Sequence, residues 1–248
     1  MNRKKILLTG GSGKLGQAIQ KRFKQKIIAP SSEVLDISNH TLVRKFFEKN
    51  DFDVIIHCAA LARMAKCQNN PLDAIETNII GTCNLAIETL RKQSREGKTI
   101  RFVYISTDGV YNGTKGNYSE KDETIPYNIY GFSKLGGECA VNALPDFCVI
   151  RTSFFDPKNI KFDHSATDAY SSKMPINELA KAILVILQKD FVGTVNIGSK
   201  RESEFDRYKA YKPGLKESKL SKILKEVPFG MAKDASMNTQ LWKALAKK

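Results

Sequence analysis

The sequence predicts an α/β fold in which helices cover both faces of a doubly wound, mostly parallel sheet. Two observations predict it. Short apolar segments typical of buried strands alternate with segments of helical periodicity, and a glycine-rich turn directly follows the first apolar segment. Because the last fifty residues lack this alternation, we expect one domain of residues 1–152 plus 176–198 and a small cap of residues 153–175 plus 199–248.

The composition is ordinary for a globular protein except for a net charge of +14. Half of this charge, from 13 Lys or Arg against 6 Asp or Glu, lies in residues 199–248. The basic residues are mostly dispersed lysines without interleaved aromatic residues. We therefore interpret them as a solvated surface that would attract a doubly negative substrate, and we expect no nucleic-acid partner.

Segment lengths and cysteine usage bear on location. No apolar run approaches about 18 residues, and the three apolar residues after Lys5 are too few for a signal-peptide core, so we expect no membrane segment. The five cysteines are scattered and form no C-x-x-C pair, which indicates reduced thiols in a cytoplasmic protein. The three histidines are far apart, and we expect no metal site.

The first predicted strand, residues 5–8, runs directly into residues 9–16, and apolar residues at helical spacing follow. Glycines at positions 10, 13 and 16 let the backbone approach a pyrophosphate, while the start of the helix supplies N–H groups and a partial positive charge. This strand–turn–helix context predicts nucleotide binding. The candidate cofactor-binding residues of this turn are Gly10, Ser12, Gly13, Lys14, Leu15 and Gly16.

The second predicted strand, residues 26–30, is followed by Ser31 rather than by the acid that would hold the ribose 2′-hydroxyl of NAD. Without a carboxylate to repel it, a 2′-phosphate could accept a hydrogen bond from Ser31, and Lys14 could also reach it. We therefore expect NADP(H) as the preferred cofactor and NAD(H) as the alternative. Glu33 would supply the missing acid if the strand ended later.

The third predicted strand, residues 53–60, ends in small residues. Small residues at the carboxyl end of a strand let a cofactor lie flat against the backbone. We interpret His57 as a packed strand residue rather than a catalyst. The candidate cofactor contacts here are Cys58, Ala59 and Ala60.

One helix is predicted before this strand in the sequence and another after it. Residues 40–49 follow a candidate N-cap, Ser38 or Asn39. Residues 69–95 form a long helical region in which Asn78 occupies a position that disfavours asparagine. A bond from the Asn78 side chain to a neighbouring loop would explain this position.

The fourth predicted strand, residues 101–105, delivers residues 106–113 to the carboxyl edge of the sheet, where open α/β folds bind ligands. A helix that carries Tyr130 and runs to about Asn142 follows. The remaining elements of this domain are a fifth strand at residues 147–151, a helix at residues 177–188 and a sixth strand at residues 194–197.

Tyr130 and Lys134 are four residues apart, so they lie on one face of their helix. An ammonium beside the phenol would favour the phenolate and lower the tyrosine pKa from about 10. A pKa near 7 would require about 4 kcal/mol of differential interaction, which a desolvated cleft with a second cation could supply. The pair therefore predicts a proton donor that works at neutral pH.

Three motifs in this order resemble those of the extended short-chain dehydrogenases/reductases: the glycine spacing at 10–16, Ser106-Thr107 before Tyr111, and Tyr130-x-x-x-Lys134. Within that superfamily the chain is similar to the dTDP-4-dehydrorhamnose reductases, also through Asp36-Ile37 and the residues around Tyr130. The likeness covers about residues 1–155. It implies a Rossmann-like fold with a dinucleotide-binding domain and a substrate-binding cap.

The resemblance implies a reductase that uses NAD(P)H on the C4 ketone of a 4-keto-6-deoxy sugar nucleotide, in the synthesis of deoxysugar precursors of polysaccharides. Tyr130 would protonate the developing alkoxide, Lys134 would lower the tyrosine pKa and hold the nicotinamide ribose, and Thr107 would donate a hydrogen bond to the carbonyl oxygen. A homodimer is left open. Further contacts implied for the cofactor are Asp36, Ile37 and Asn78, and for the substrate Asp108 and Phe154.

The sequence departs from this family at Gly109, where the reductases usually carry an aromatic residue. Related 4,6-dehydratases carry an Asp-Glu pair at this point, and because Gly109 replaces the glutamate, elimination would lack its base. Two alternatives to the reductase stay open. One is a sugar-nucleotide 4-epimerase that keeps NAD tightly bound, and the other is a non-catalytic NADP-binding subunit like the regulatory subunit of methionine adenosyltransferase.

Overall fold

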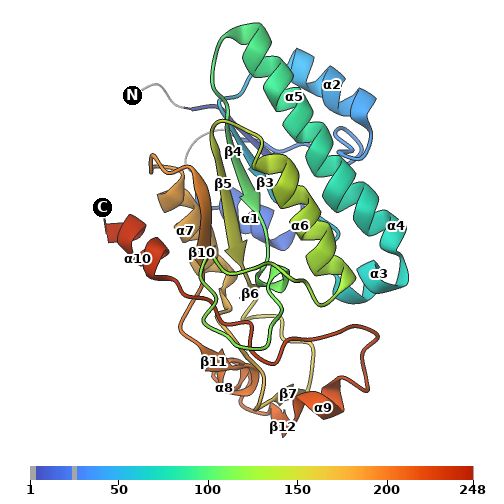
Figure 1. Ribbon diagram of the computed structural model, residues 1–248, viewed down its shortest axis with the longest axis vertical. Helices are drawn as coiled ribbons and strands as arrows, with labels where there is room; N and C mark the ends of the chain where they lie inside the picture. The colour runs from blue at the N-terminus through green and yellow to red at the C-terminus, as the bar shows by residue number, and fades with distance from the viewer. Residues whose placement is uncertain (1–3, 24–26, 248) are drawn as a thin grey trace.

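A six-stranded parallel sheet forms the centre of the molecule. The computed structural model describes residues 4–23 and 27–247. The strand order is β10-β5-β4-β3-β1-β2, and every neighbouring pair is parallel (Figure 1). The parallel, doubly wound sheet predicted from the sequence is confirmed. Its strands are β1 (Ile6–Thr9), β2 (Ile27–Ile28), β3 (Val54–His57), β4 (Arg101–Ile105), β5 (Phe147–Thr152) and β10 (Gly193–Ile197).

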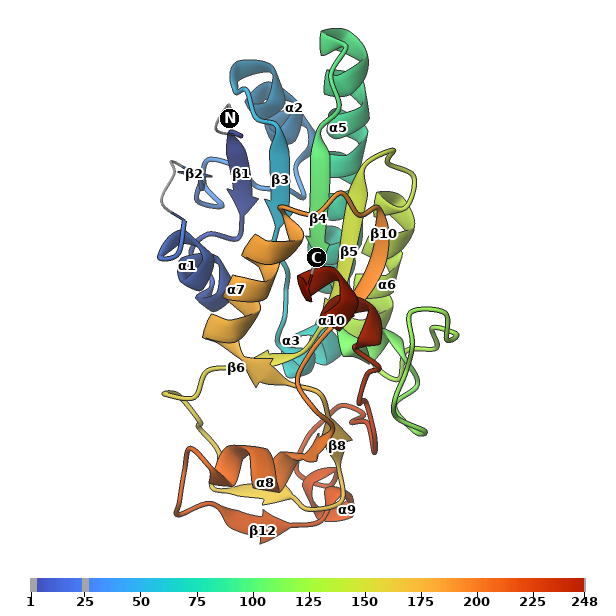
Figure 2. The ribbon, with the colours of Figure 1, turned by 90° about the vertical axis from the view of Figure 1, so that its left-hand side faces the viewer.

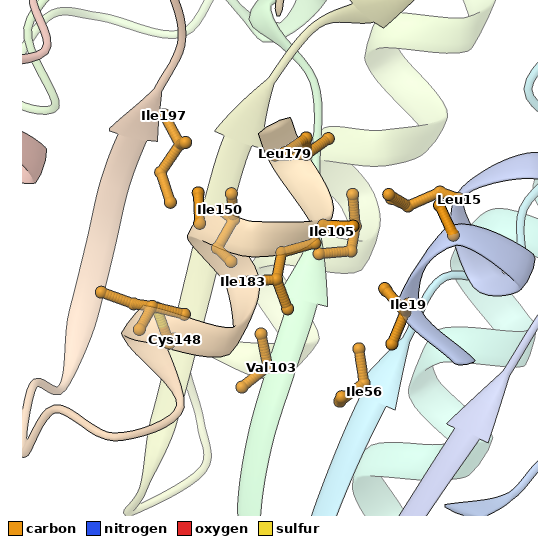
Figure 3. Packing of buried hydrophobic residues seen from close by; sticks show 14 of the residues in the cluster. Leu15, Ile19, Ile56, Val103, Ile105, Cys148, Ile150, Leu179, Ile183 and Ile197 are labelled. Carbon is orange, nitrogen blue, oxygen red and sulfur yellow. The ribbon is translucent and has the colours of Figure 1, made fainter. Parts of the chain in front are cut away.

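Helices cover both faces of this sheet (Figure 2). Because successive side chains of a strand point to opposite faces, Leu8 of β1 packs in one core and Leu7 in the other. Figure 3 shows Ile19 and Ile183 lying over the first of these faces. The helices are α1 (Lys14–Gln20) and α7 (Ile176–Ile186) on that face, and α2 (His40–Lys49), α5 (Gly81–Glu96) and α6 (Ile129–Val141) on the other.

The strand order reverses at β1, which pairs with β2 on one side and β3 on the other. In open α/β sheets a ligand crevice lies at the carboxyl ends of the strands where the order reverses. The chain leaves β1 through the glycine turn and leaves β3 through residues 58–60. The topology therefore places these two predicted cofactor segments on either side of one crevice.

Some elements differ from their predicted extents. The expected strand at 26–30 is limited to Ile27–Ile28, and residue 26 lies outside the described residues. The third strand ends at His57, so the small residues after it form a loop. The long helical region predicted at 69–95 is observed as uninterrupted helix over residues 71–96, made of α4 (Pro71–Ala74), a π-helix at Ile75–Ile80, and α5. A separate short helix, α3 (Met64–Asn69), precedes it.

The cap consists of short elements beyond the carboxyl ends of the strands (Figure 1). Its strands pair as β6 with β9, β7 with β12, and β8 with β11. The cap elements are β6 (Phe154–Phe155), β7 (His164–Ala166), β8 (Tyr170–Ser171), β9 (Met174–Pro175), β11 (Glu202–Ser203), α8 (Glu204–Lys209), β12 (Lys216–Ser218) and α9 (Leu220–Ile223).

The last helix, α10 (Gln240–Lys247), departs from the expected cap boundary. Trp242 and Leu245 pack against the core on the α7 face of the sheet. The chain therefore crosses the cap and returns to the sheet domain before it ends. Along the described part of the chain, no helix combines the length and the apolar character needed to cross a membrane.

Candidate functional site

The glycine turn after β1 approaches the end of β3 closely. Gly10 has a φ of +71°, and a Cβ atom there would lie 2.5 Å from the backbone nitrogen of Ala59. Only glycine fits at this position because both the left-handed backbone and the contact with residues 58–60 exclude a side chain. The turn ends at Gly13, whose N–H donates to the Gly10 carbonyl oxygen over 3.0 Å.

Ser12, Gly13 and Lys14 are exposed residues at the start of α1, whereas Leu15 and Gly16 are buried beneath them. A pyrophosphate could therefore reach the glycine turn at the start of α1, and the residues present fit a dinucleotide cofactor. The Lys14 ammonium lies 3.2 Å from the Asp156 carboxylate of the cap, an ion pair that the sequence reasoning did not foresee.

Three of the predicted cofactor contacts, Ser31, Asp36 and Ile37, lie after β2. Ser31 is exposed and has no carboxylate immediately beside it in the sequence. Asp36 is exposed and accepts hydrogen bonds from the Ser38 backbone N–H (3.0 Å) and hydroxyl (2.7 Å), which forms the turn before α2. Ile37 is buried against Gly81 of α5. Asp36 therefore stabilises the turn before α2, and Ile37 packs against α5. Their contact with the cofactor stays a prediction.

Asn78 makes the bond to a neighbouring loop that its mid-helix position predicted. Its Oδ1 accepts from the Leu61 N–H (2.8 Å), while Nδ2 donates to the Leu61 carbonyl oxygen (3.1 Å) and to Ser133 Oγ (2.8 Å). The side chain therefore ties the loop after β3 to α6. Its amide is engaged with the protein, so Asn78 positions the cofactor loop.

His57 is buried and packed, as the sequence reasoning proposed. Its ring nitrogens lie 2.7 Å from Thr9 Oγ1 and 3.0 Å from Thr82 Oγ1. Burial lowers the pKa of His57 well below its ordinary value, and the charge of Lys134 lowers it further. A neutral imidazole with both nitrogens engaged holds β3 in place.

Thr107 and Tyr130 are brought together by a close contact between two elements. Thr107 caps the short 3₁₀ helix Asp108–Val110, because its Oγ1 accepts from the Gly109 N–H over 3.1 Å. A Cβ atom at Gly131 would lie 2.2 Å from the Gly109 carbonyl oxygen, so α6 meets this turn directly. The Tyr130 phenol thereby lies near enough to the Thr107 hydroxyl for a hydrogen bond to lower its pKa.

The expected effect of Lys134 on the Tyr130 pKa is wrong for this geometry. Burial is the largest cause of a Tyr130 pKa well above its ordinary value, the charge of Asp108 raises it further, and Lys134 makes no resolved contribution. The Lys134 ammonium lies 4.0 Å from the centre of the Tyr104 ring. Lys134 is itself only 2% exposed, and burial lowers its pKa to about 7.

We expect Lys134→Met to change how stability depends on pH. In the folded protein the Lys134 pKa is about 7 against an ordinary value of 10.5, so the unfolded chain binds the additional proton between these pH values. The free energy of unfolding of the wild type should therefore rise relative to the variant by about 1.4 kcal/mol per pH unit in that window. Urea titrations at three pH values would measure this, and parallel curves would show that the buried lysine stays charged.

A pocket lies beside Thr107 and Tyr130. The sequence predicted one of the residues that line it, Asp108, but not the pocket itself. Asp108 lines it from the sheet domain, and Ser153, Lys173 and Glu204 line it from the cap. The pKa of Asp108 is raised to about 6, chiefly by burial; the charge of Lys173 lowers it and that of Glu204 raises it. Phe154, predicted as a substrate contact, is 37% exposed and does not line this pocket.

Of the residues that line this pocket, Asp108 was predicted as a substrate contact, and the missed ones include Tyr127, Lys173 and Glu204. Lys173 and Glu204 come from segments without the α/β alternation, and no motif marks them. Tyr127 lies three residues before Tyr130 and could have been noticed as a second phenol near the first.

Within the residues that the structure describes, no group of three His, Cys, Asp or Glu side chains is placed to hold a metal ion.

A buried polar network lies beneath the site and joins α6 to the sheet. Arg151 Nη2 donates to Glu138 Oε2 over 2.7 Å, and its Nη1 donates to the Tyr111 hydroxyl over 3.0 Å. The Ser106 hydroxyl also donates to Glu138. Because Glu138 is one turn after Lys134, this network fixes the helix that carries the candidate catalytic side chains.

Comparisons with known proteins show the family of this chain. Residues 4–164 match the family model described as the RmlD substrate binding domain. The chain is 34% identical over 156 residues to dTDP-4-dehydrorhamnose reductase of Mycolicibacterium smegmatis, covering 60% of this chain and 45% of that protein. It is 33% identical over 148 residues to methionine adenosyltransferase 2 subunit beta of Pongo abelii, covering 56% of this chain and 42% of that protein.

The alignments therefore span under half the length of these two relatives. The fold is similar to that of dTDP-4-dehydrorhamnose reductase from Bacillus anthracis, solved in complex with NADP, with a TM-score of 0.86 and 22% identity over 98% of this chain and 92% of that one. At that identity the likeness shows the fold, whereas the family match covers well over half of the sequence. The chain belongs to the RmlD substrate binding domain family, within the extended short-chain dehydrogenases/reductases.

Proposed function

We propose that this protein is an NADPH-dependent reductase of the C4 ketone of a 4-keto-6-deoxy sugar nucleotide. The observation that carries the proposal is that Thr107, Tyr130 and Lys134 lie at the carboxyl edge of the sheet, and that Lys134 is close to Cys58 in the loop that the glycine turn contacts. Tyr130 is half-buried and beside Thr107, and Lys134 is buried one turn further along α6. The similarity to a dTDP-4-dehydrorhamnose reductase supports the reaction and the class of substrate.

The geometry divides the chemistry between cofactor and protein. The cofactor supplies the hydride. The raised pKa keeps the Tyr130 phenol protonated at neutral pH, so it has a proton to donate when negative charge develops on the substrate oxygen. Thr107 donates a hydrogen bond to the same oxygen and orients it. Lys134, with a pKa near 7, lies one turn along α6 from Tyr130 and would hold the ribose of the cofactor when it is bound.

NADP(H) is the proposed cofactor, with NAD(H) as the alternative. The chain places Ser31 and Ser32, rather than an acid, directly after β2 and Pro30. A 2′-phosphate would accept hydrogen bonds from these hydroxyls without repulsion from a carboxylate. The NADP complex of the structurally similar Bacillus anthracis reductase supports the same choice.

The test is a cofactor-oxidation assay against a panel of 4-keto-6-deoxy sugar nucleotides on different nucleotide carriers. We expect reduction of at least one member, faster with NADPH than with NADH. A chain that binds NADPH but oxidises it with no member of the panel would contradict the proposal. If the purified protein instead retained NAD through catalysis without net oxidation, the 4-epimerase reading would hold.

A second candidate function is that of a non-catalytic NADP-binding subunit. The 33% identity to methionine adenosyltransferase 2 subunit beta supports it. Against it, Thr107, Tyr130 and Lys134 are all present. NADPH binding without turnover, together with co-purification of a partner enzyme, would favour this function over the reductase.

Two further proposals concern the whole molecule. Exposed apolar side chains follow one another along α4 to α5, among them Leu72, Ile80 and Leu90, and they support a homodimer. Light scattering of the purified protein would give its molar mass and test this.

We also propose a cytoplasmic location, which the five free cysteines support.

A further inference from the structure

A carboxylate of the cap reaches back to the glycine turn of the sheet domain. Asp156 directly follows β6, and its Oδ2 accepts a hydrogen bond from Lys14 Nζ over 3.2 Å. Lys14 is the first residue of α1, next to Ser12 and Gly13, where the phosphates of a dinucleotide are expected. It is also the one basic residue of the turn at 9–16. The cap therefore pairs with the one side-chain cation that this turn offers to a phosphate.

Hydrogen bonds within the cap hold the Asp156 carboxylate in place. Its Oδ1 accepts from the Lys158 N–H over 3.1 Å, and its carbonyl oxygen accepts from the Asn159 N–H over 3.0 Å. The preceding residue, Phe155, is buried and packs edge-on against Tyr208, with ring centres 5.2 Å apart. Because none of these contacts involves Lys14, we expect the carboxylate to stay beside the glycine turn when the ammonium moves.

The packing of two helices places this cap turn beside α1. β6 pairs with β9, and β9 continues directly into α7. Residues of α7 and α1 share the core on one face of the sheet, and β6 lies at the start of α7 (Figure 2). The position of Asp156 next to Lys14 therefore follows from the way the sheet domain and the cap are joined.

The ion pair is open to competition from another anion. The Lys14 side chain is 55% exposed and that of Asp156 is 27% exposed. An exposed pair of this kind favours the paired state by a factor of about five at most, and the flexible stem of lysine lets the ammonium turn to a new partner without a change of the backbone. A phosphate at the start of α1 would be such a partner.

We propose that Asp156 competes with the phosphates of NADP(H) for Lys14 and so keeps the cofactor exchangeable. Without cofactor the ammonium pairs with the cap carboxylate. When a phosphate takes the ammonium, the ion pair is broken, and its free energy is subtracted from that of cofactor binding. Weaker retention suits a reductase, which must release NADP⁺ and take up NADPH in every cycle. The inference rests on the proposed function, because it takes NADP(H) as the ligand of the glycine turn.

The variant Asp156→Asn tests the competition. It removes the negative charge and keeps an oxygen that can accept from the Lys158 N–H, so the turn should persist. We expect it to bind NADPH about two- to fivefold more tightly than the wild type in a fluorescence titration at low salt. The gain should shrink at about 0.5 M salt, because ions screen exposed charges beyond about 4 Å there.

Two further variants serve as controls. Asp163→Asn makes the same charge change in the same cap segment, on a side chain that is 84% exposed and pairs with Lys212, and it should leave NADPH affinity unchanged. Lys14→Met should weaken NADPH binding. Adding Asp156→Asn to Lys14→Met should then give no further change, because the two substitutions remove the same interaction.

The same titrations with NADH show which phosphate meets Lys14. NADH carries the pyrophosphate and lacks the 2′-phosphate. If Asp156→Asn tightens the binding of both cofactors equally, Lys14 pairs with the pyrophosphate. A gain for NADPH alone assigns it to the 2′-phosphate. Both results support the competition.

The remaining outcomes separate this inference from the reductase. An NADPH affinity that Asp156→Asn leaves unchanged or lowers would overturn the inference alone. So would an equal gain in the presence of Lys14→Met, because Asp156 would then act on the phosphates without the lysine. The reductase would still stand or fall by its turnover assay. If the wild type bound neither NADPH nor NADH, both proposals would be overturned.

Discussion

Tyr130→Phe is expected to lower turnover by a factor of about 10² to 10⁴ while NADPH affinity stays within about twofold of the wild type. The substitution removes the only proton that the phenol can donate and keeps the ring that packs beside Thr107. Because the Tyr130 pKa is raised, the wild type holds that proton throughout the neutral range. Steady-state oxidation of NADPH with a 4-keto sugar nucleotide gives the rate, and a fluorescence titration gives the cofactor affinity.

Tyr211→Phe is the matched control for this experiment. It removes a phenol hydroxyl that is on the cap, where Tyr211 is 47% exposed and packs against Phe155. Turnover of this control should match that of the wild type. Near-normal turnover of Tyr130→Phe would show that another group is the acid, and Tyr127 would then be the next phenol to test.

Glu138→Ala is expected to destabilise the protein by about 3 to 5 kcal/mol. Glu138 is 1% exposed and Arg151 is 7% exposed, so the substitution leaves a buried guanidinium without its carboxylate. Ser106 loses its acceptor at the same time. Urea unfolding followed by circular dichroism measures the loss, and Glu138→Gln, which keeps one acceptor oxygen, should lose less.

An exposed ion pair provides the comparison for this experiment. Arg44 Nε lies 3.1 Å from Glu48 Oε1 on the surface of α2, with side chains 62% and 46% exposed. Glu48→Ala should cost no more than about 0.5 kcal/mol, because water already solvates both charges. If Glu138→Ala and Glu48→Ala lowered the free energy of unfolding by similar amounts, the network around Arg151 would not hold α6 to the sheet.

Several features could be read from the sequence because they depend on neighbours in the chain. The strand at residues 101–105 and the helix at 40–49 have the predicted bounds, and Asn39 accepts from the Leu42 N–H as the predicted N-cap. Asn78 bonds the loop at Leu61, as its unfavourable position in a helix suggested. Periodicity, capping and the spacing of glycines are local properties, so one sequence was enough to predict them.

The pKa values of the candidate catalytic residues were harder to predict from the sequence than the helices and strands. The spacing of Tyr130 and Lys134 predicts one helix face, but the pKa of each depends on how deeply the folded chain buries it and on which charges come close. Packing places the Lys134 ammonium over Tyr104 and the Tyr130 phenol near Asp108, and the expected lowering of the tyrosine pKa is reversed. Desolvation is a property of the whole fold, and no motif encodes it.

The sequence by itself determined the parallel α/β sheet, the glycine turn at the end of β1 and the order of the candidate catalytic residues. Only the tertiary structure decided that Lys173 and Glu204 meet Asp108 in one pocket, and that α10 returns from the cap to the sheet. Helix caps, tight turns and side-chain periodicity act within a few residues and leave a pattern in the chain. Contacts between segments tens of residues apart form only when the core closes, so they leave none.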